Sequence, residues 1–140
     1  MVDDVGSACD AGRPGSFPRC RDKGPTRFER RNVFEKHSLE GYKTPLPGIR
    51  MKTLCYGERT LMTEFVLERA GELPMHAHPY EQTGYLVKGH IRLTIAGQAH
   101  DLTPGDSWCI PPDAEHGAEI LEDSVAIEVF SPVREDYLPG

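Results

Sequence analysis

Two histidines one residue apart, with a glutamine four residues beyond them, constrain this chain more than any other feature. The residues are His76, His78 and Gln82, in a segment that begins at Gly71 and ends at Gly89. Side chains two or four positions apart lie on the same side of an extended segment, because strand side chains alternate between faces. The three side chains are therefore expected to meet in one site.

A second stretch, Gly105–His116, brings one more histidine into consideration. Neutral imidazoles and an oxygen donor are ligands that divalent transition metals accept in proteins. We therefore predict one divalent metal, held by His76, His78, Gln82 and His116. Ni, Zn, Mn, Fe and Co all accept this ligand set, so the sequence leaves the metal open. The other three histidines have no such companions and are expected at the surface: His37, His90 and His100.

Gln82, not its neighbour Glu81, is the expected oxygen ligand, because strand alternation points Glu81 to the opposite face. Three neutral imidazoles and a neutral amide leave the full positive charge on the metal. That charge favours an anionic, oxygen-rich ligand and Lewis-acid chemistry. The missing anionic donor argues against oxygen activation, since such a donor helps to stabilise higher oxidation states.

From Pro45 onward, short apolar segments alternate with turns rich in Gly, Pro and Asp, which predicts an all-β domain without a helix of ordinary length. Many short strands in one small domain favour a jelly roll or closed barrel, because closure leaves few exposed edges. The expected strands are Ile49–Tyr56, Leu61–Glu68, Gln82–Val87, Ile91–Ile95, Gln98–Leu102, Ser107–Ile110, Gly117–Leu121 and Ser124–Phe130.

Two details of these strands are open to test. Lys88-Gly89-His90 is expected to form a tight hairpin between its flanking strands. In the last strand, the alternation of Val125, Ile127 and Val129 predicts that this set faces the core, whereas Glu128 on the other face could point to solvent or to a cavity.

Length and charge bound the class of protein. The 140 residues suit a single domain, and the net charge of -6 argues against a nucleic-acid partner, because phosphate binding needs a basic surface. No apolar stretch is long enough to span a bilayer, and the acidic start Met1–Asp4 does not resemble a secretory signal. We therefore expect a cytoplasmic protein.

The chain is expected to divide into three parts: a disordered or loosely attached leader at 1–26, a lead-in segment at 27–44, and a barrel at 45–140. Within the lead-in, Arg27–His37 suits a short helix or an edge strand equally well. The four cysteines show no metal-binding or disulfide spacing, so Cys55 and Cys109 are expected to be free thiols that behave as small apolar residues.

The two histidine stretches resemble the paired sequence motifs of the cupin superfamily. Asp113 stands where those motifs have a glycine, Gln82 replaces the usual ligating glutamate, and the gap between the first glycine and the first histidine is one residue short. The resemblance implies a double-stranded β-helix barrel with a metal inside, commonly as a homodimer. The positions that fit are Gly71, His76, His78, Gly89, Gly105, Pro111 and His116.

The C-terminal stretch extends this resemblance to one cupin group, the KdgF-type pectin-degradation proteins, which also share His76–Gln82. The group converts 4,5-unsaturated uronates into linear 5-keto-4-deoxyuronates. Carried over by position, Glu128, Phe130 and Arg134 match its pocket aspartate, phenylalanine and arginine, which implies catalytic roles. A carboxylate, an aromatic ring and a guanidinium beside a metal suit a carboxylated sugar. The alternatives are a metal-dependent dioxygenase and a non-catalytic sugar-acid binding module.

Overall fold

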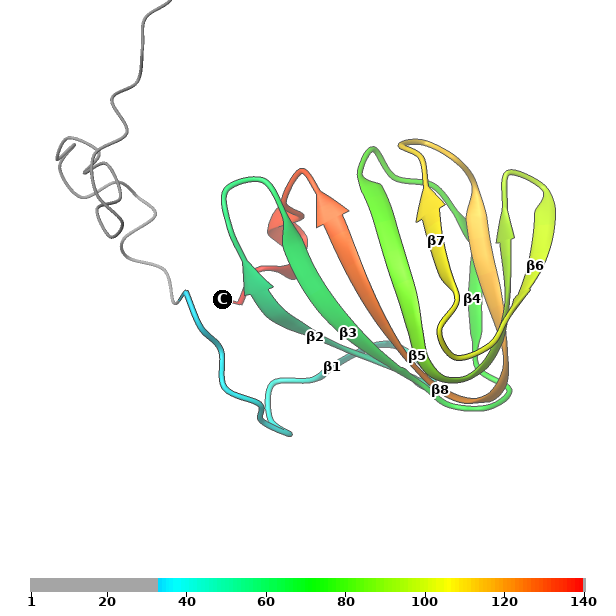
Figure 1. The fold of residues 1–140 in the computed structure, drawn as a ribbon, viewed down its shortest axis with the longest axis horizontal. Coiled ribbons are helices and arrows are strands. Elements are labelled where there is room, and N and C mark those ends of the chain that lie inside the picture. Colours follow the sequence, from blue (N-terminus) through cyan, green and yellow to red (C-terminus); the bar gives the residue numbers. More distant parts are fainter. Residues whose placement is uncertain (1–32, 140) are drawn as a thin grey trace, which may run out of the picture.

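The structure is a computed structural model that describes residues 33–139, and it is almost entirely β (Figure 1). Within that range, one short 3-10 helix, Glu135–Tyr137, is the only helical element. The all-β prediction is confirmed. The eight strands are β1 (Lys43–Leu46), β2 (Ile49–Tyr56), β3 (Leu61–Leu67), β4 (Glu72–His76), β5 (Glu81–Ile95), β6 (Gln98–Leu102), β7 (Ser107–Ile110) and β8 (His116–Ser131).

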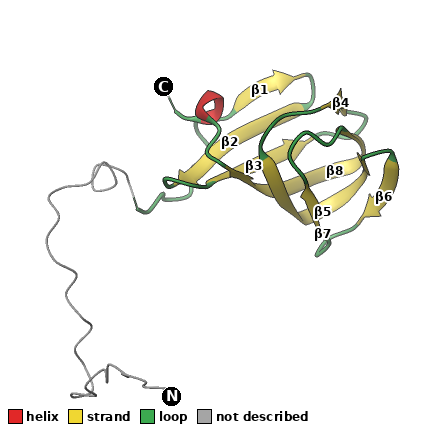
Figure 2. Ribbon diagram, turned by 90° about the horizontal axis from the view of Figure 1, so that it is seen from above, coloured by secondary structure: helices red, strands yellow, loops and turns green. Residues whose placement is uncertain are grey.

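The strands form one antiparallel sheet in the order β1-β2-β3-β8-β5-β6, with β4 added beside β8 and β7 beside β5. The long strands β5 and β8 pair with each other from Glu81↔Ser131 to Ile95↔His116. Because both strands bend, the sheet curls around a common interior (Figures 1 and 2). The result is the expected jelly-roll barrel.

The predicted hairpin at Lys88-Gly89-His90 is wrong, because β5 continues through it. Pairing with β8 is irregular here, as in a β-bulge, and Gly89 has a φ of 97°. A Cβ on Gly89 would lie 2.0 Å from Ser124 Oγ, which accepts a hydrogen bond from the His90 backbone N–H at 3.0 Å. The glycine therefore marks a bend shared by two strands. For the same reason the two strands expected at Gly117–Leu121 and Ser124–Phe130 are one strand.

The core face predicted for the last strand is also wrong. Ala126 and Phe130 are buried, whereas Val125, Ile127 and Val129 are only half-buried on the outer face. Both faces of this part of β8 carry apolar residues, so alternation alone does not say which face is inside. Glu128, two positions from Ala126 and from Phe130, therefore points into the barrel.

The interior is a continuous cluster of aliphatic and aromatic side chains. One face of β3 is buried, including the polar Thr63, whose Oγ1 donates to the Glu128 backbone carbonyl at 3.1 Å. The largest fully buried side chains include Phe130, Ile49, Leu61, Leu86 and Ile110.

Outside the barrel, residues 33–37 form neither the helix nor the edge strand considered for Arg27–His37, and the leader lies outside the described residues. Cys55 and Cys109 are free thiols as expected, but both are exposed rather than packed as apolar residues. The structure describes no helix long and apolar enough to cross a membrane.

Candidate metal centre

Three histidines from two separate parts of the chain meet at one end of the barrel, with His76 exposed and His116 buried. His76 ends β4 and pairs across the sheet with His116, which begins β8. His78 follows in the loop, and its backbone carbonyl accepts a hydrogen bond from the Asp113 N–H at 2.8 Å. One ring nitrogen from each histidine lies within 4.8 Å of the others, and this is the only such group among residues 33–139. The structure thus brings together the predicted imidazoles.

The hydrogen bonds of two rings leave one nitrogen of each ring available. His76 Nδ1 lies 2.8 Å from the Pro74 carbonyl, and His116 Nδ1 lies 2.9 Å from the Ala114 carbonyl. A carbonyl only accepts, so each Nδ1 carries the hydrogen and each Nε2 keeps a free lone pair. His116 Nε2 is buried without a hydrogen-bond partner. A buried, unpartnered lone pair of this kind suits metal ligation.

Gln82 supplies an oxygen to the same cluster. The side chain is buried, its Oε1 lies 3.0 Å from His78 Nε2, and the neighbouring Glu81 is exposed, as strand alternation predicted. An imidazole nitrogen and an amide oxygen this close together could both ligate one divalent metal. Moving the proton of His78 to its unpartnered Nδ1 would therefore turn this hydrogen-bonded pair into two adjacent ligands. The donor set fits a divalent metal.

The protonation state of His78 and His116 is also compatible with metal binding. Burial lowers the pKa of His78 and of His116, and the positive charge of Arg134 lowers both further. Both rings are therefore neutral at neutral pH. Neutral imidazole is the form that binds metals.

Glu128 lies next to the Gln82 amide, on the side away from His78. Its Oε2 accepts a hydrogen bond from Gln82 Nε2 at 2.6 Å. Burial raises the pKa of the Glu128 carboxyl to about 7, although the Gln82 hydrogen bond, the nearby Trp108 indole N–H and the charge of Arg134 all act to lower it. Trp108 Nε1 makes no hydrogen bond of ordinary geometry. The indole N–H therefore lowers the pKa of Glu128 because it lies close to the carboxylate, without being hydrogen-bonded to it.

Trp108 is a site residue that the sequence reasoning missed. Gly84 pairs with Trp108 on one side and with Glu128 on the other, and a Cβ on Gly84 would lie 2.1 Å from the indole ring. The absence of a side chain at Gly84 is what lets the indole reach the carboxylate. A glycine inside a strand is the signal that could have indicated this close approach.

Arg134 lies at the mouth of the site among three aromatic rings. Its guanidinium carbon is 3.8 Å from the Tyr137 ring centroid and 5.2 Å from those of Phe130 and Tyr80. Sequence reasoning identified Phe130 but missed both tyrosines, because Tyr80 lies in a loop and Tyr137 in the C-terminal turn.

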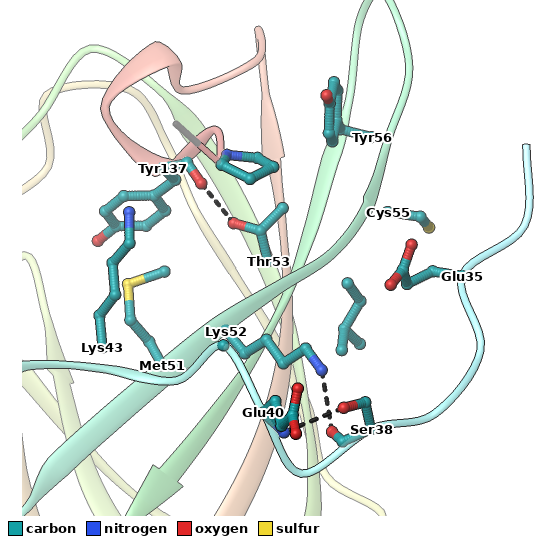
Figure 3. A pocket seen from close by; sticks show the side chains of 13 residues that line it. Glu35, Ser38, Glu40, Lys43, Met51, Lys52, Thr53, Cys55, Tyr56 and Tyr137 are labelled. Atoms are coloured by element: carbon teal, nitrogen blue, oxygen red, sulfur yellow. Dashed lines mark hydrogen bonds between the residues drawn. The ribbon is translucent and has the colours of Figure 1, made fainter. Parts of the chain in front are cut away.

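All seven predicted site residues border one cavity of about 60 Å³: His76, His78, Gln82, His116, Glu128, Phe130 and Arg134. A larger cavity of about 520 Å³ lies elsewhere, between the lead-in segment and β2 (Figure 3). Tyr137 borders both cavities, but none of the three clustered histidines borders the larger one.

Comparisons with known proteins agree with this geometry. A cupin domain profile, Cupin_2, matches residues 63–131. The solved structure of KdgF from Halomonas sp. is 30% identical, with a TM-score of 0.72, and the match covers 76% of this chain and 99% of that one. The pectin degradation protein KdgF of Dickeya dadantii is 29% identical over 93 residues, which are 65% of this chain and 84% of that protein.

A third relative, the H2HPP isomerase of Bacillus subtilis, is 30% identical over 105 residues, 74% of this chain. The match spans only 42% of that longer protein. The fold and site define a cupin barrel. This chain belongs to the cupin superfamily, and within it the chain resembles the KdgF-type pectin-degradation cupins.

The structure explains one departure from the cupin motif. Asp113, which stands in place of the motif glycine, has a φ of 63°. This left-handed conformation favours glycine, but aspartate tolerates it better than most residues. Asp113 can therefore form the same turn as the motif glycine, and its N–H still donates to the His78 backbone carbonyl.

Proposed function

We propose that this cupin is a metal-dependent enzyme that converts 4,5-unsaturated uronates into linear 5-keto-4-deoxyuronates. The observation that carries the proposal is the shared cavity, which joins a three-histidine cluster to a carboxylate, Glu128, and to a guanidinium, Arg134. The similarity to two KdgF proteins, one of them described as a pectin degradation protein, supports a substrate of this class.

His76, His78, Gln82 and His116 would hold the metal. When bound, a divalent metal there supplies Lewis-acid polarisation of a ligand oxygen. Arg134 supplies a planar fork of N–H donors that matches a carboxylate. Phe130, buried next to Arg134 and 5.9 Å from His78 between ring centroids, forms an apolar wall of the cavity.

Glu128 is the proton donor in this scheme. Hydration of the unsaturated sugar needs a proton at C4 and a water oxygen at C5, and the hemiketal formed at C5 then opens to the ketone. Glu128 is a carboxyl group inside the cavity, so it can deliver the proton to C4 and recover one from the attacking water.

The size of the cavity limits how a sugar binds. About 60 Å³ corresponds to about two water molecules, whereas sites that enclose a small molecule usually exceed 300 Å³. We therefore propose that the C4–C5 edge of the uronate, with its carboxylate, enters the cavity while the rest of the ring stays at the mouth, near Tyr80 and Tyr137.

The test is direct. Purified metal-loaded protein should speed the loss of the enol-ether absorbance of an unsaturated galacturonate or guluronate above the spontaneous rate, without consuming oxygen. A rate no higher than background on both sugars would contradict the proposal. Oxygen consumption coupled to turnover would instead favour the dioxygenase alternative.

A further inference from the structure

The Arg134 side chain is held in place by several contacts, although it lies at the mouth of the site. Its side chain is only 14% exposed and is stacked against the Tyr137 ring. The Tyr137 N–H donates to the Arg134 carbonyl at 3.1 Å, and Thr53 Oγ1 on β2 donates to the Tyr137 carbonyl at 2.6 Å (Figure 3). The turn that carries the guanidinium is therefore tied to the barrel wall.

Asp136 completes this arrangement. Its Oδ1 accepts from Arg134 Nε at 3.2 Å, and its Oδ2 accepts from Nη2 at 2.6 Å. A guanidinium carries five N–H groups, so both N–H groups of Nη1 and one of Nη2 are not used by Asp136. The Asp136 side chain is 55% exposed and does not border the cavity, whereas Arg134 does. The carboxylate therefore approaches the guanidinium from the solvent side.

We propose that Asp136 is a positioning residue: it fixes the Nε–Nη2 edge of Arg134 so that the Nη1 end faces the cavity and receives the carboxylate of an anionic ligand. The identity of that ligand as a sugar acid rests on the proposed function. Ordering the guanidinium before the ligand arrives removes part of the entropy that binding would otherwise lose. The hydrogen bond to Arg134 lowers the pKa of Asp136, so the pair stays ionised at neutral pH.

The opposite role for Asp136 is that of a competitor whose carboxylate the ligand must displace. The two roles predict opposite signs for Asp136→Asn, which keeps the shape and removes the charge. If Asp136 is a positioning residue, the substitution weakens ligand binding. If Asp136 is a competitor, the substitution strengthens ligand binding.

The experiment titrates full-length, metal-loaded protein with D-galacturonate, a saturated acid that cannot be hydrated. Asp136→Asn should raise its dissociation constant about tenfold, the scale of one charge-assisted contact. The matched control is Asp101→Asn, which removes a similarly exposed carboxylate from Arg92 at 2.9 Å and should leave binding unchanged. Tighter or unchanged binding in Asp136→Asn overturns the proposal.

A second readout separates this proposal from the reaction itself. The NMR signal of Arg134 Nε–H, assigned by its loss in Arg134→Lys, should shift with galacturonate and should broaden in Asp136→Asn without ligand. On an unsaturated uronate, Asp136→Asn should raise KM and leave kcat within about twofold.

If wild-type protein shows no turnover but galacturonate still shifts the Arg134 signal, the proposed reaction is wrong and the positioning role stands. If galacturonate leaves this signal unchanged in wild type, the positioning role is wrong.

Discussion

Gln82 and Glu128 are joined by a hydrogen bond of 2.6 Å from Gln82 Nε2 to Glu128 Oε2. An amide has one donor end and one acceptor end, so this bond fixes which end faces the histidines. The carbonyl oxygen, 3.0 Å from His78 Nε2, is the end that can ligate a metal. Glu128 therefore orients the proposed oxygen ligand, Gln82, in addition to its proposed part in proton transfer.

The first prediction separates these two roles of Glu128. Glu128→Gln keeps an acceptor for the Gln82 amide, so metal affinity should stay within a few-fold while turnover falls about 100- to 10,000-fold. Glu128→Ala removes the acceptor, so metal affinity itself should fall about 10- to 100-fold. Isothermal titration with Zn²⁺ and the uronate assay measure the two effects. Full turnover in Glu128→Gln would remove Glu128 from proton transfer.

The second prediction concerns the histidines. His76→Ala, and separately His116→Ala, should lose stoichiometric metal after dialysis, because each removes one of three neutral donors. The barrel should remain folded by circular dichroism, since neither residue belongs to the apolar core. His100→Ala changes an exposed histidine outside the cluster and serves as control. Full metal occupancy in the His76 variant would exclude His76 as a ligand.

The grouping of His76, His78 and Gln82 could be predicted from sequence because it depends on local spacing, whereas their role as metal ligands remains a prediction. His76, His78 and Gln82 lie close together in one extended stretch, where a period of two fixes which side chains share a side. Most strand positions were also predictable from turn residues. The dimer, the domain limits and the cytoplasmic location remain predictions.

The predictions that were wrong or missing concern packing and turn contacts, which local strand spacing does not reveal. β-branched residues favour strands whichever face they occupy. The alternation of Val125, Ile127 and Val129 therefore led to the wrong prediction of which face of β8 points into the barrel. Trp108 joins the site through a contact across the fold, toward Glu128, that no sequence spacing reveals. Asp136 lies only two residues from Arg134, but the turn at Glu135–Tyr137 that brings its carboxylate to the guanidinium has no strand periodicity to indicate it.

The third prediction tests the bend of β5. Gly89→Ala should destabilise the protein by about 3 kcal/mol or more, because the φ of 97° is strained for alanine and the new Cβ would overlap Ser124. Gly105→Ala is the matched control. Gly105 has the same φ of 97° but no atom within 4 Å of the added Cβ, so its cost should be only about 1 to 2 kcal/mol. Urea unfolding measures the difference, and equal costs would show that the contact with Ser124 is unimportant.

The last prediction links Gly84 to the site. In Gly84→Ala the new Cβ would lie 2.1 Å from the Trp108 ring, so the indole must move away from Glu128. Because the indole N–H stabilises the charged form, its departure should raise the pKa of Glu128 above about 7. The apparent pKa of metal-free protein, followed by NMR of a labelled Glu128 carboxyl, measures this shift. Gly57→Ala is the control, because open space surrounds its added Cβ. If Gly84→Ala changes Trp108 fluorescence but leaves the Glu128 pKa unchanged, the indole fills space beside the carboxylate and has no electrostatic effect on it.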